Sequence, residues 1–231
     1  MARNDQSAPM TTAVRVVIGG QSLQGDLGMP GQPRGIALFA HGSGSSRHSR
    51  RNQYVARALE RRGLATLLID LLTADEEAID DQTAEYRFDI GMLSERLVAI
   101  VDWLRQQTAT SSLPIGLFGA STGGGAALMA AAARPRDVAA VVSRGGRPDL
   151  AAAALSRVMS PTLLIVGGLD TDVIEMNRDA RRQMRGEVVL EIVPGATHLF
   201  EEAGALERVA ELAGDWFIQH MPQASSTRAG R

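Results

Sequence analysis

Two residue types are missing from this sequence of 231 residues, namely cysteine and lysine. Without cysteine the chain has no disulfide framework, no thiolate metal site and no cysteine nucleophile. Without lysine it has neither a Schiff-base lysine nor the phosphate-binding lysine of a Walker A loop. A covalent catalyst in this chain must therefore use another side chain, and arginine must supply the permanent positive charge.

A strong charge and long apolar runs are also missing. The formal net charge of -2 gives no sign of attraction to nucleic acid or to an anionic membrane. No apolar stretch reaches the roughly 18 residues that span a bilayer, and the first residues lack the continuous apolar core of a secretory signal. We therefore expect a cytoplasmic protein with neither a nucleic-acid nor a membrane partner.

Short apolar runs alternate with stretches of helical periodicity along the chain. Ile36–Ala40 is typical of a strand buried on both faces, and Ile90–Gln106 of an amphipathic helix. This alternation predicts an α/β fold with a mostly parallel central sheet and helices on both faces. A chain of this length buries one core, so we predict one domain over residues 1–222, frayed at 1–10, and a disordered tail at 223–231.

The residues that follow each strand are the candidates for a functional site, because ligands bind beyond the carboxyl ends of parallel strands. Ser121 follows the apolar run 115–118, inside the stretch G-A-S-T-G of residues 119–123. This is the G-x-S-x-G pattern of a nucleophile elbow, a strained strand-to-helix turn that needs small neighbours. Neither phosphate-binding glycine pattern is present in the turn. The pattern predicts a nucleophilic Ser121, and the alternative is a serine that only caps the following helix.

Two partners for this serine follow later strands. Asp170 and His198 complete the chain order serine, aspartate, histidine, which is the order of an α/β-hydrolase triad. His198 is the predicted base, since an imidazole titrates near neutrality, and Asp170 would orient it. Asp172 competes with Asp170 for this role, and His41 is the alternative histidine, for which we expect a structural bond to loop backbone instead.

Backbone N–H groups near the predicted elbow offer an oxyanion hole. The Thr122 N–H begins the helix after the serine and has no helical acceptor. The second donor should come from the loop after an earlier strand, where the sequence H-G-S-G begins at residue 41. We predict the Ser43 N–H for this role, with Gly42 as the alternative.

Other candidate residues lie at the exit of a strand and in an acidic segment. Arg144 and Arg147 flank a Gly-Gly pair at this exit, and the functional interpretation is a cation that faces the pocket, suited to an anionic substrate. The competing interpretation is a salt bridge to the acidic segment 75–89, for example to Asp89. Residues 71–88 are acidic and read as irregular chain. We expect segment 71–90 to form a lid or one pocket wall, with Tyr86 and Phe88 as apolar substrate contacts. No zinc-binding motif is present, and we expect neither a metal nor a cofactor.

Four stretches of the chain resemble the α/β-hydrolase superfamily, and within it the dienelactone-hydrolase-like branch. They are ALFAHGSGSS, GLFGASTGGGAAL, PTLLIVGGLDTDV and VPGATHLFEE, and the resemblance extends over about residues 34–220. The stretches HGSGSSRHSRRN, RFDI and VVSRGGRPDL further resemble bacterial hydrolase domains that occur alone or fused to a phosphoribosyltransferase-like domain. The resemblance implies a serine hydrolase triad. Dienelactone hydrolases proper use a cysteine, so Ser121 points to ordinary ester hydrolysis.

The sequence thus predicts a serine hydrolase that cleaves a small carboxylic ester or thioester through an acyl-enzyme. An acyltransferase or perhydrolase would use the same triad and differ only in its acceptor. A binding or regulatory domain with this fold is the third hypothesis, because fold alone proves no function. A phosphoribosyltransferase is the expected partner if the chain acts with another protein.

Overall fold

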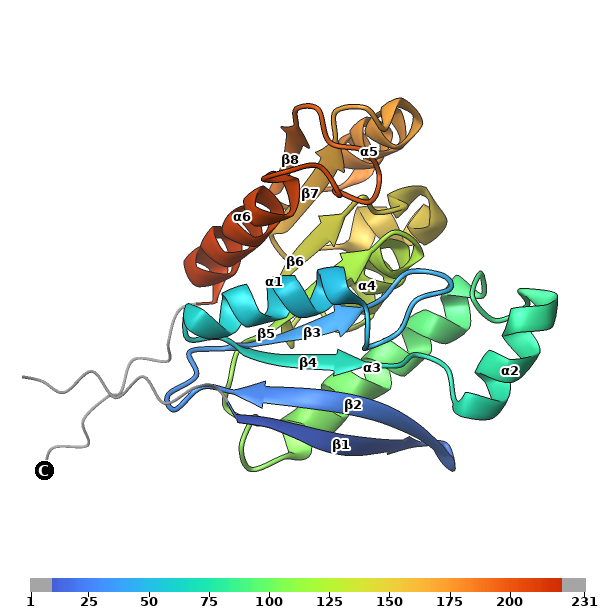
Figure 1. Cartoon of the computed structure of the whole chain (residues 1–231), viewed down its shortest axis with the longest axis vertical. Coiled ribbons are helices and arrows are strands. Elements are labelled where there is room, and N and C mark those ends of the chain that lie inside the picture. Colours follow the sequence, from blue (N-terminus) through green and yellow to red (C-terminus); the bar gives the residue numbers. More distant parts are fainter. Residues whose placement is uncertain (1–9, 222–231) are drawn as a thin grey trace, which may run out of the picture.

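The apolar runs of the sequence form a central sheet of eight strands (Figure 1), and the computed structural model describes residues 10–221. The strands are β1 (Met10–Ile18), β2 (Gln21–Met29), β3 (Ile36–Ala40), β4 (Ala65–Ile69), β5 (Ile115–Ala120), β6 (Val138–Arg144), β7 (Thr162–Gly167) and β8 (Val188–Val193). The helices are α1 (Arg50–Arg61), α2 (Ala74–Thr83), α3 (Ile90–Gln106), α4 (Thr122–Ala133), the 3₁₀ segment η1 (Pro148–Arg157), α5 (Thr171–Gln183) and α6 (Ala205–His220).

The strand order is β1-β2-β4-β3-β5-β6-β7-β8. Strands β4, β3, β5, β6, β7 and β8 are parallel, whereas β1 and β2 pair antiparallel with their neighbours. The predicted α/β-hydrolase fold with a mostly parallel sheet is confirmed. The chain passes from β3 outward to β4 and then returns to β5, so β3 and β5 flank the point where the strand order reverses. Open α/β sheets bind ligands at such a point.

Both faces of the sheet are covered by helices, which explains the continuous apolar runs of the inner strands. In β3, Ile36, Leu38 and Ala40 belong to the core under α3 and α4, while Phe39 faces the core under α1 and α6. Figure 1 shows α1 and α6 together in front of the sheet and α3 behind it. Alternate residues of one strand therefore serve two cores, and this burial holds the strand ends in place.

Three regions differ from the sequence-based prediction. Residues 21–29 form β2, which the sequence did not signal because alternating glycine and polar residues obscure its pattern. The segment 71–90 contains a regular helix, α2, with a capping box formed by Thr73 and Glu76. The alanine-rich stretch 150–157, whose composition is typical of an α-helix, belongs to the 3₁₀ segment η1, which is kinked at Ala152.

The predicted fraying of residues 1–10 and the predicted disordered tail at 223–231 fall outside the described residues, with one exception. Met10 is the first residue of β1 and pairs with Met29, so the prediction of fraying at residue 10 is wrong. Between residues 10 and 221 no helix combines the length and the apolar character needed to cross a bilayer.

Candidate active site

Ser121 occupies the single residue between β5 and α4, in a backbone conformation that non-glycine residues rarely adopt. Its φ is 51° and its ψ is −122°, and such strain persists only where the surroundings enforce it. Ser121 N–H donates to Arg144 O at 3.2 Å, and Arg147 N–H donates to Ser121 O at 3.0 Å. The Ser121 side chain makes no capping hydrogen bond, so the alternative of a capping serine does not hold.

The glycines around Ser121 are explained by close backbone contacts. A Cβ atom at Gly119 would lie 2.5 Å from Gly123 O, and one at Gly123 would lie 2.3 Å from Ala40 O. Gly124 packs against Gly146, and a Cβ at Gly125 would lie 2.8 Å from the carbonyl oxygen of residue 147. The first turn of α4 therefore sits directly on the loops after β3 and β6, and larger side chains would push the serine out of position.

His198 and Asp170 lie beside this elbow, although they are 77 and 49 residues away from Ser121 in the chain. His198 Nδ1 lies 2.6 Å from Asp170 Oδ2, and His198 Nε2 lies 3.4 Å from Ser121 Oγ. With its proton on Nδ1, the ring donates to the aspartate and presents a lone pair to the serine hydroxyl. The contact to the serine is long, as is common in the absence of substrate.

Asp170 stands at the N-cap position of α5, yet its carboxylate does not cap the helix. It accepts the bond from His198 instead. The competing Asp172 lies exposed in the first turn of α5. The turn that carries His198 is braced by Glu202, which accepts hydrogen bonds from the Thr197 N–H and hydroxyl at 3.0 and 2.6 Å. These bonds lower the pKa of Glu202.

The strand order explains how residues so far apart in sequence meet. Strands β3, β5, β6, β7 and β8 are consecutive neighbours, and Ser43, Ser121, Arg144, Asp170 and His198 follow or end them in that order. Parallel strands present all their carboxyl ends at one edge. The structure thus brings together five of the residues predicted from strand ends, and their chemical roles stay predictions.

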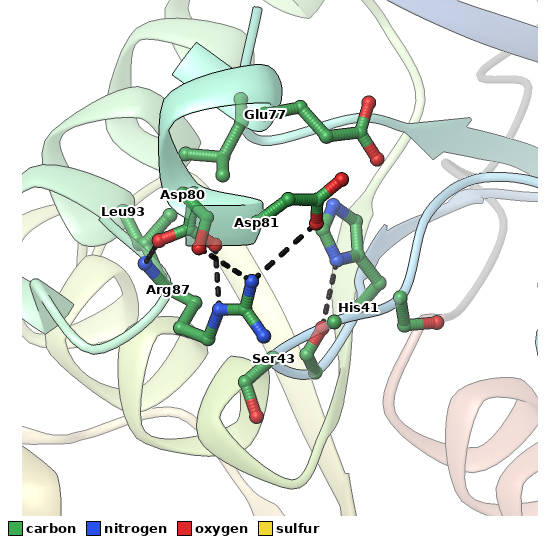
Figure 2. Close-up of a pocket in the computed structure, with 11 residues that line it drawn as sticks. His41, Ser43, Glu77, Asp80, Asp81, Arg87 and Leu93 are labelled. Carbon is green, nitrogen blue, oxygen red and sulfur yellow. Dashed lines mark hydrogen bonds and ion pairs between the residues drawn. The ribbon is translucent and has the colours of Figure 1, made fainter. Parts of the chain in front are cut away.

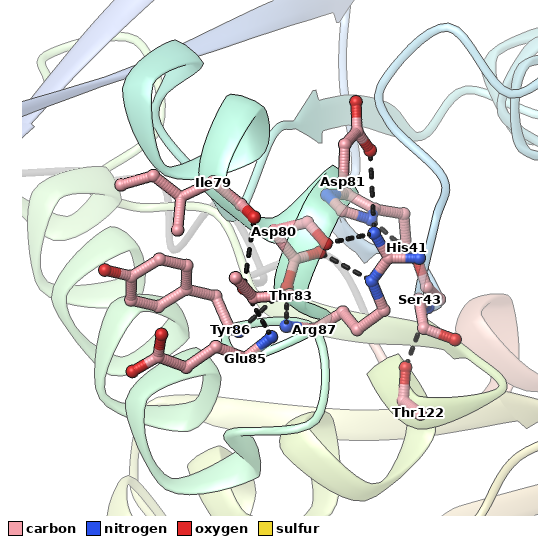
Figure 3. A network of polar contacts seen from close by, with 11 residues as sticks. His41, Ser43, Ile79, Asp80, Asp81, Thr83, Glu85, Tyr86, Arg87 and Thr122 are labelled. Atoms are coloured by element: carbon pink, nitrogen blue, oxygen red, sulfur yellow. Dashed lines mark hydrogen bonds and ion pairs between the residues drawn. The ribbon is translucent and has the colours of Figure 1, made fainter.

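The two predicted oxyanion donors are adjacent, but one of them already has an acceptor. Ser43 N–H donates to Thr122 Oγ1 at 2.9 Å, a contact drawn in Figure 3. Thr122 is the first residue of α4, so its own N–H lacks an acceptor within the helix. The alternative donor, Gly42, lies against the elbow, where a Cβ would come within 3.0 Å of the Ser121 Cβ. To bind the Ser43 N–H, an oxyanion would have to replace the Thr122 hydroxyl as its acceptor or share the donor with it.

His41 holds the loop after β3, as predicted from its position. Its Nδ1 lies 3.0 Å from Gly42 O, and the Leu71 N–H donates to its Nε2 at 3.0 Å. Desolvation of the ring lowers the pKa of His41, so the neutral form is favoured. Figure 2 shows this ring against a small pocket beneath the loop, opposite Asp81 and Arg87. Both ring nitrogens are engaged with backbone, so His41 cannot serve as the base.

A cavity of about 230 Å³ opens at Ser121. Arg144 and His198 line it, together with Leu199 and parts of the loop after β3. Arg144 is 7% exposed, and it makes no ion pair with segment 71–90. The acid suggested for it, Asp89, instead caps α3 through a bond from the Met92 N–H at 2.9 Å. The interpretation that Arg144 pairs with the acidic segment is therefore wrong.

Three other predictions about this region need correction. Arg147 does not pair with the acidic segment either, since it forms a bidentate pair with Asp149. Tyr86 and Phe88 do not line the cavity at Ser121. Phe88 is 59% exposed. The Tyr86 N–H donates to Asp80, which lines a separate pocket on the other side of the loop after β3. Neither aromatic residue is placed to contact a substrate at Ser121.

The structure also brings residues to the cavity that the sequence interpretation missed. Ser49, Arg51 and Asn52 line it from the first turn of α1. A signal was present, because this turn holds two arginines and no acid, although helix N-termini favour negative charge. Asn177 was missed as well; it is fully buried and donates to Gly146 O at 3.0 Å, which steadies the loop between Arg144 and Arg147.

Segment 71–90 is anchored by two polar networks. Glu76 receives bonds from Arg96 and from the Thr73 N–H; burial opposes ionisation, but these bonds outweigh it and lower the pKa of Glu76 to about 2. Figure 3 shows the second network, in which buried Asp80 accepts bonds from the Arg87 side chain and from the backbone of Tyr86 and Arg87. The segment is a wall, held by these two networks, beneath the loop after β3.

Comparison with known proteins identifies relatives along most of the chain. The model of the dienelactone hydrolase family matches residues 27–221. A crystal structure of a dienelactone hydrolase from Anabaena variabilis is 58% identical, with a TM-score of 0.91 over 93% of this chain and 99% of that one. Two Mycobacterium tuberculosis proteins named as phosphoribosyl transferases are 57% identical over 90% of this chain. The chain spans only 46% of their length.

More distant structures share the fold alone. Est1E from Butyrivibrio proteoclasticus is 18% identical to this chain and has a TM-score of 0.76 over 90% of it and 98% of that protein. The same arrangement of strands and helices thus persists where little of the sequence does.

Proposed function

This chain belongs to the dienelactone hydrolase family, and from that premise we propose that it is a serine hydrolase of small carboxylic esters or thioesters. The observation that carries the proposal is the chain of contacts from Ser121 Oγ through the His198 ring to Asp170, set at a strained strand-to-helix elbow. A serine with no capping bond, beside a base held by a third group, is the arrangement that nucleophilic catalysis requires.

In the proposed mechanism Ser121 Oγ attacks the carbonyl carbon while His198 Nε2 accepts its proton. Asp170 keeps the His198 ring in the tautomer that can accept this proton and stabilises the imidazolium that forms. The tetrahedral intermediate collapses as His198 returns the proton to the leaving group, which leaves an acyl group on Ser121. A water molecule, deprotonated by His198, then attacks the acyl carbon. The bond between that carbon and Ser121 Oγ breaks, His198 returns the proton to the serine oxygen, and the acid is released.

The negative oxygen of the intermediate would be held by the N–H groups of Thr122 and Ser43. The Thr122 N–H is aimed from the positive end of α4. In the absence of substrate the Ser43 N–H donates to the Thr122 hydroxyl. That hydroxyl therefore takes the place of the oxyanion as the acceptor. Binding of the intermediate would then exchange one hydrogen bond for a stronger, charge-assisted one.

The size of the cavity and the likeness to longer relatives bear on substrate and partner. A volume of about 230 Å³ is below the range of drug-sized pockets, so the proposed substrate is small.

The relatives named as phosphoribosyl transferases extend well beyond the region that matches this chain. A phosphoribosyltransferase is therefore the partner we propose, and co-purification of the two proteins tests it.

The decisive experiment combines active-site labelling with one substitution. Wild-type protein should hydrolyse p-nitrophenyl acetate and take up one fluorophosphonate group on the tryptic peptide that contains Ser121. Ser121→Ala should lose the label and lower kcat by about 10⁴-fold or more, because the nucleophile is gone. Ser112→Ala, at an exposed serine, is the control and should keep both. A phosphonate label on another residue, or esterase activity that survives Ser121→Ala, would rule out the proposal.

A further inference from the structure

Strand β8 leaves one edge of the sheet open. It is the last strand in the order, and among residues 10–221 it pairs only with β7; Figure 1 shows it at the end of the sheet, next to α5. Its sequence, V-V-L-E-I-V, is rich in β-branched residues, and its first five residues are partly exposed. The free edge of such a strand carries N–H and C=O groups that another extended chain can pair with.

A groove of about 510 Å³ lies between β8 and α5. Leu190 and Ile192 line it from the strand, on the face that belongs to a small apolar cluster under α5. Arg178, Arg181 and Arg182 line it from the helix. Among the described residues that line the groove none is acidic. The open edge therefore has an apolar surface and a row of positive charges directly beside it.

Much of this positive charge is available to a ligand. Arg178 pairs with Glu175 at 2.5 Å and Arg182 pairs with Asp179, but all four side chains are more than half exposed. Such pairs are weak and are readily exchanged for others. For Arg181 the described part of the chain supplies no ion pair at all. The groove thus offers guanidinium groups that a negatively charged partner can engage.

The same charges argue against a second copy of this chain as the occupant. Antiparallel pairing of two β8 strands about a twofold axis would place both α5 helices on the same face of the joined sheet. The arginines of the two grooves would then face each other across the axis, and like charges in that arrangement are destabilising. A partner with the opposite charge meets no such repulsion.

We infer that β8 and its groove bind an extended acidic segment of a partner protein, which adds to the sheet as a ninth strand. Successive side chains of a strand point to opposite faces, so acidic residues at every second position would all lie against the arginines of α5. On its other face β8 carries Glu191, which disfavours acids there. The segment should therefore alternate acidic with neutral, β-forming residues. This inference goes beyond the proposed function and does not depend on it.

The test uses a fluorescein-labelled peptide of about eight residues in which glutamate alternates with valine and threonine. Fluorescence anisotropy gives its Kd. One matched peptide carries lysine in place of glutamate, and another has the same composition with the glutamates consecutive. The alternating acidic peptide should bind at least about 10-fold more tightly than either, the combined value of three exposed ion pairs. Its advantage over the lysine peptide should shrink in about 0.5 M NaCl.

Charge reversal then assigns the binding to the groove. Arg178→Glu, Arg181→Glu and Arg182→Glu together should weaken the acidic peptide by about 10-fold or more and strengthen the lysine peptide. The single change Arg181→Glu should weaken the acidic peptide by about 3-fold, and it replaces the triple variant if circular dichroism shows that one to be unfolded. Arg15→Glu is the matched control, because Arg15 is exposed on β1 at the opposite edge of the sheet. It should leave Kd unchanged.

Backbone methylation distinguishes strand addition from attraction between charges alone. Two further acidic peptides carry N-methyl groups on either the odd or the even residues, so that each lacks the N–H donors of one edge. A strand that adds to β8 uses only one of its edges for pairing. One of these peptides should therefore lose its binding while the other keeps it.

Three outcomes would overturn the inference. The acidic peptide fails to bind or binds no better than the matched peptides, which would mean that the arginines only protect the open edge from pairing. The folded charge-reversal variants bind the acidic peptide as the wild type does. The two methylated peptides have equal Kd values. None of these results bears on the labelling of Ser121, so a failure here is distinct from a failure of the proposed function.

Discussion

The loop of residues 42–45 separates two pockets that differ in whether their arginine is paired with an acid. The pocket beneath it, of about 70 Å³, is lined by His41, Asp80, Asp81 and Arg87, and Figure 2 shows the arginine held between the two aspartates. The cavity above it contains Arg144, for which no described residue supplies a counter-ion. The two guanidinium groups thus differ in partners although one short loop lies between them.

The difference shows how pairing separates a charge that stabilises the fold from one that does not. Arg87 donates to the Asp80 carboxylate from Nε at 2.6 Å and to the Asp80 carbonyl oxygen at 2.7 Å, so its charge is paired within the chain. A group with complete interactions stabilises the fold and has little left to offer a ligand. A buried charged group without a partner lowers stability. Three substitutions test this contrast.

The largest change in stability is expected when the pair between Arg87 and Asp80 is broken. Arg87→Met should lower the free energy of unfolding by about 3 kcal/mol, because it leaves the buried carboxylate of Asp80 without its cation. Urea unfolding followed by circular dichroism measures this change. Arg208→Met breaks the exposed pair with Glu211 and should cost no more than about 0.5 kcal/mol. If the two substitutions cost the same, the Arg87 pair is not structural.

A smaller effect, dependent on pH, is expected at Glu76. Its folded pKa of about 2 lies below the unfolded value, so the carboxylate stabilises the fold fully above about pH 4.5. This contribution is lost as the pH falls toward 2. Glu76→Gln should lower the free energy of unfolding at pH 7 by about 2 kcal/mol, and the gap to wild type should narrow at pH 3. Urea midpoints at pH 7, 5 and 3 give the comparison; a gap that stays constant would refute the assigned pKa.

The smallest expected effect has the opposite sign. Arg144→Met removes a buried charge that has no counter-ion and leaves no group behind without a partner. We expect the free energy of unfolding to rise by about 1 kcal/mol, because an apolar side chain suits the site better in the absence of ligand. Differential scanning calorimetry should show a Tm a few degrees higher. A clear fall in Tm would mean that Arg144 is a structural residue, like Arg87.

Much of the fold and of the candidate site followed from the sequence because their signals are local. A buried strand reads as a short apolar run wherever it lies, as Ile36–Ala40 does, and the glycines around Ser121 report a crowded turn. The order of Ser121, Asp170 and His198 after three strands then placed them at one edge of a parallel sheet. Strand β2 was not predicted, because its glycines and polar residues interrupt any apolar run.

The tertiary structure alone decided which charges pair. The sequence offered Arg144 and Arg147 as equivalents three positions apart, but one ends a central strand inside the cavity and the other meets Asp149 at the surface. Arg51 joins the site from the first turn of α1, although the sequence interpretation gave it no role. A side chain's partners depend on how distant elements pack, and no local pattern reports that. For this reason the sequence could name a nucleophile, but only the assembled fold could show a cation that has no counter-ion beside it.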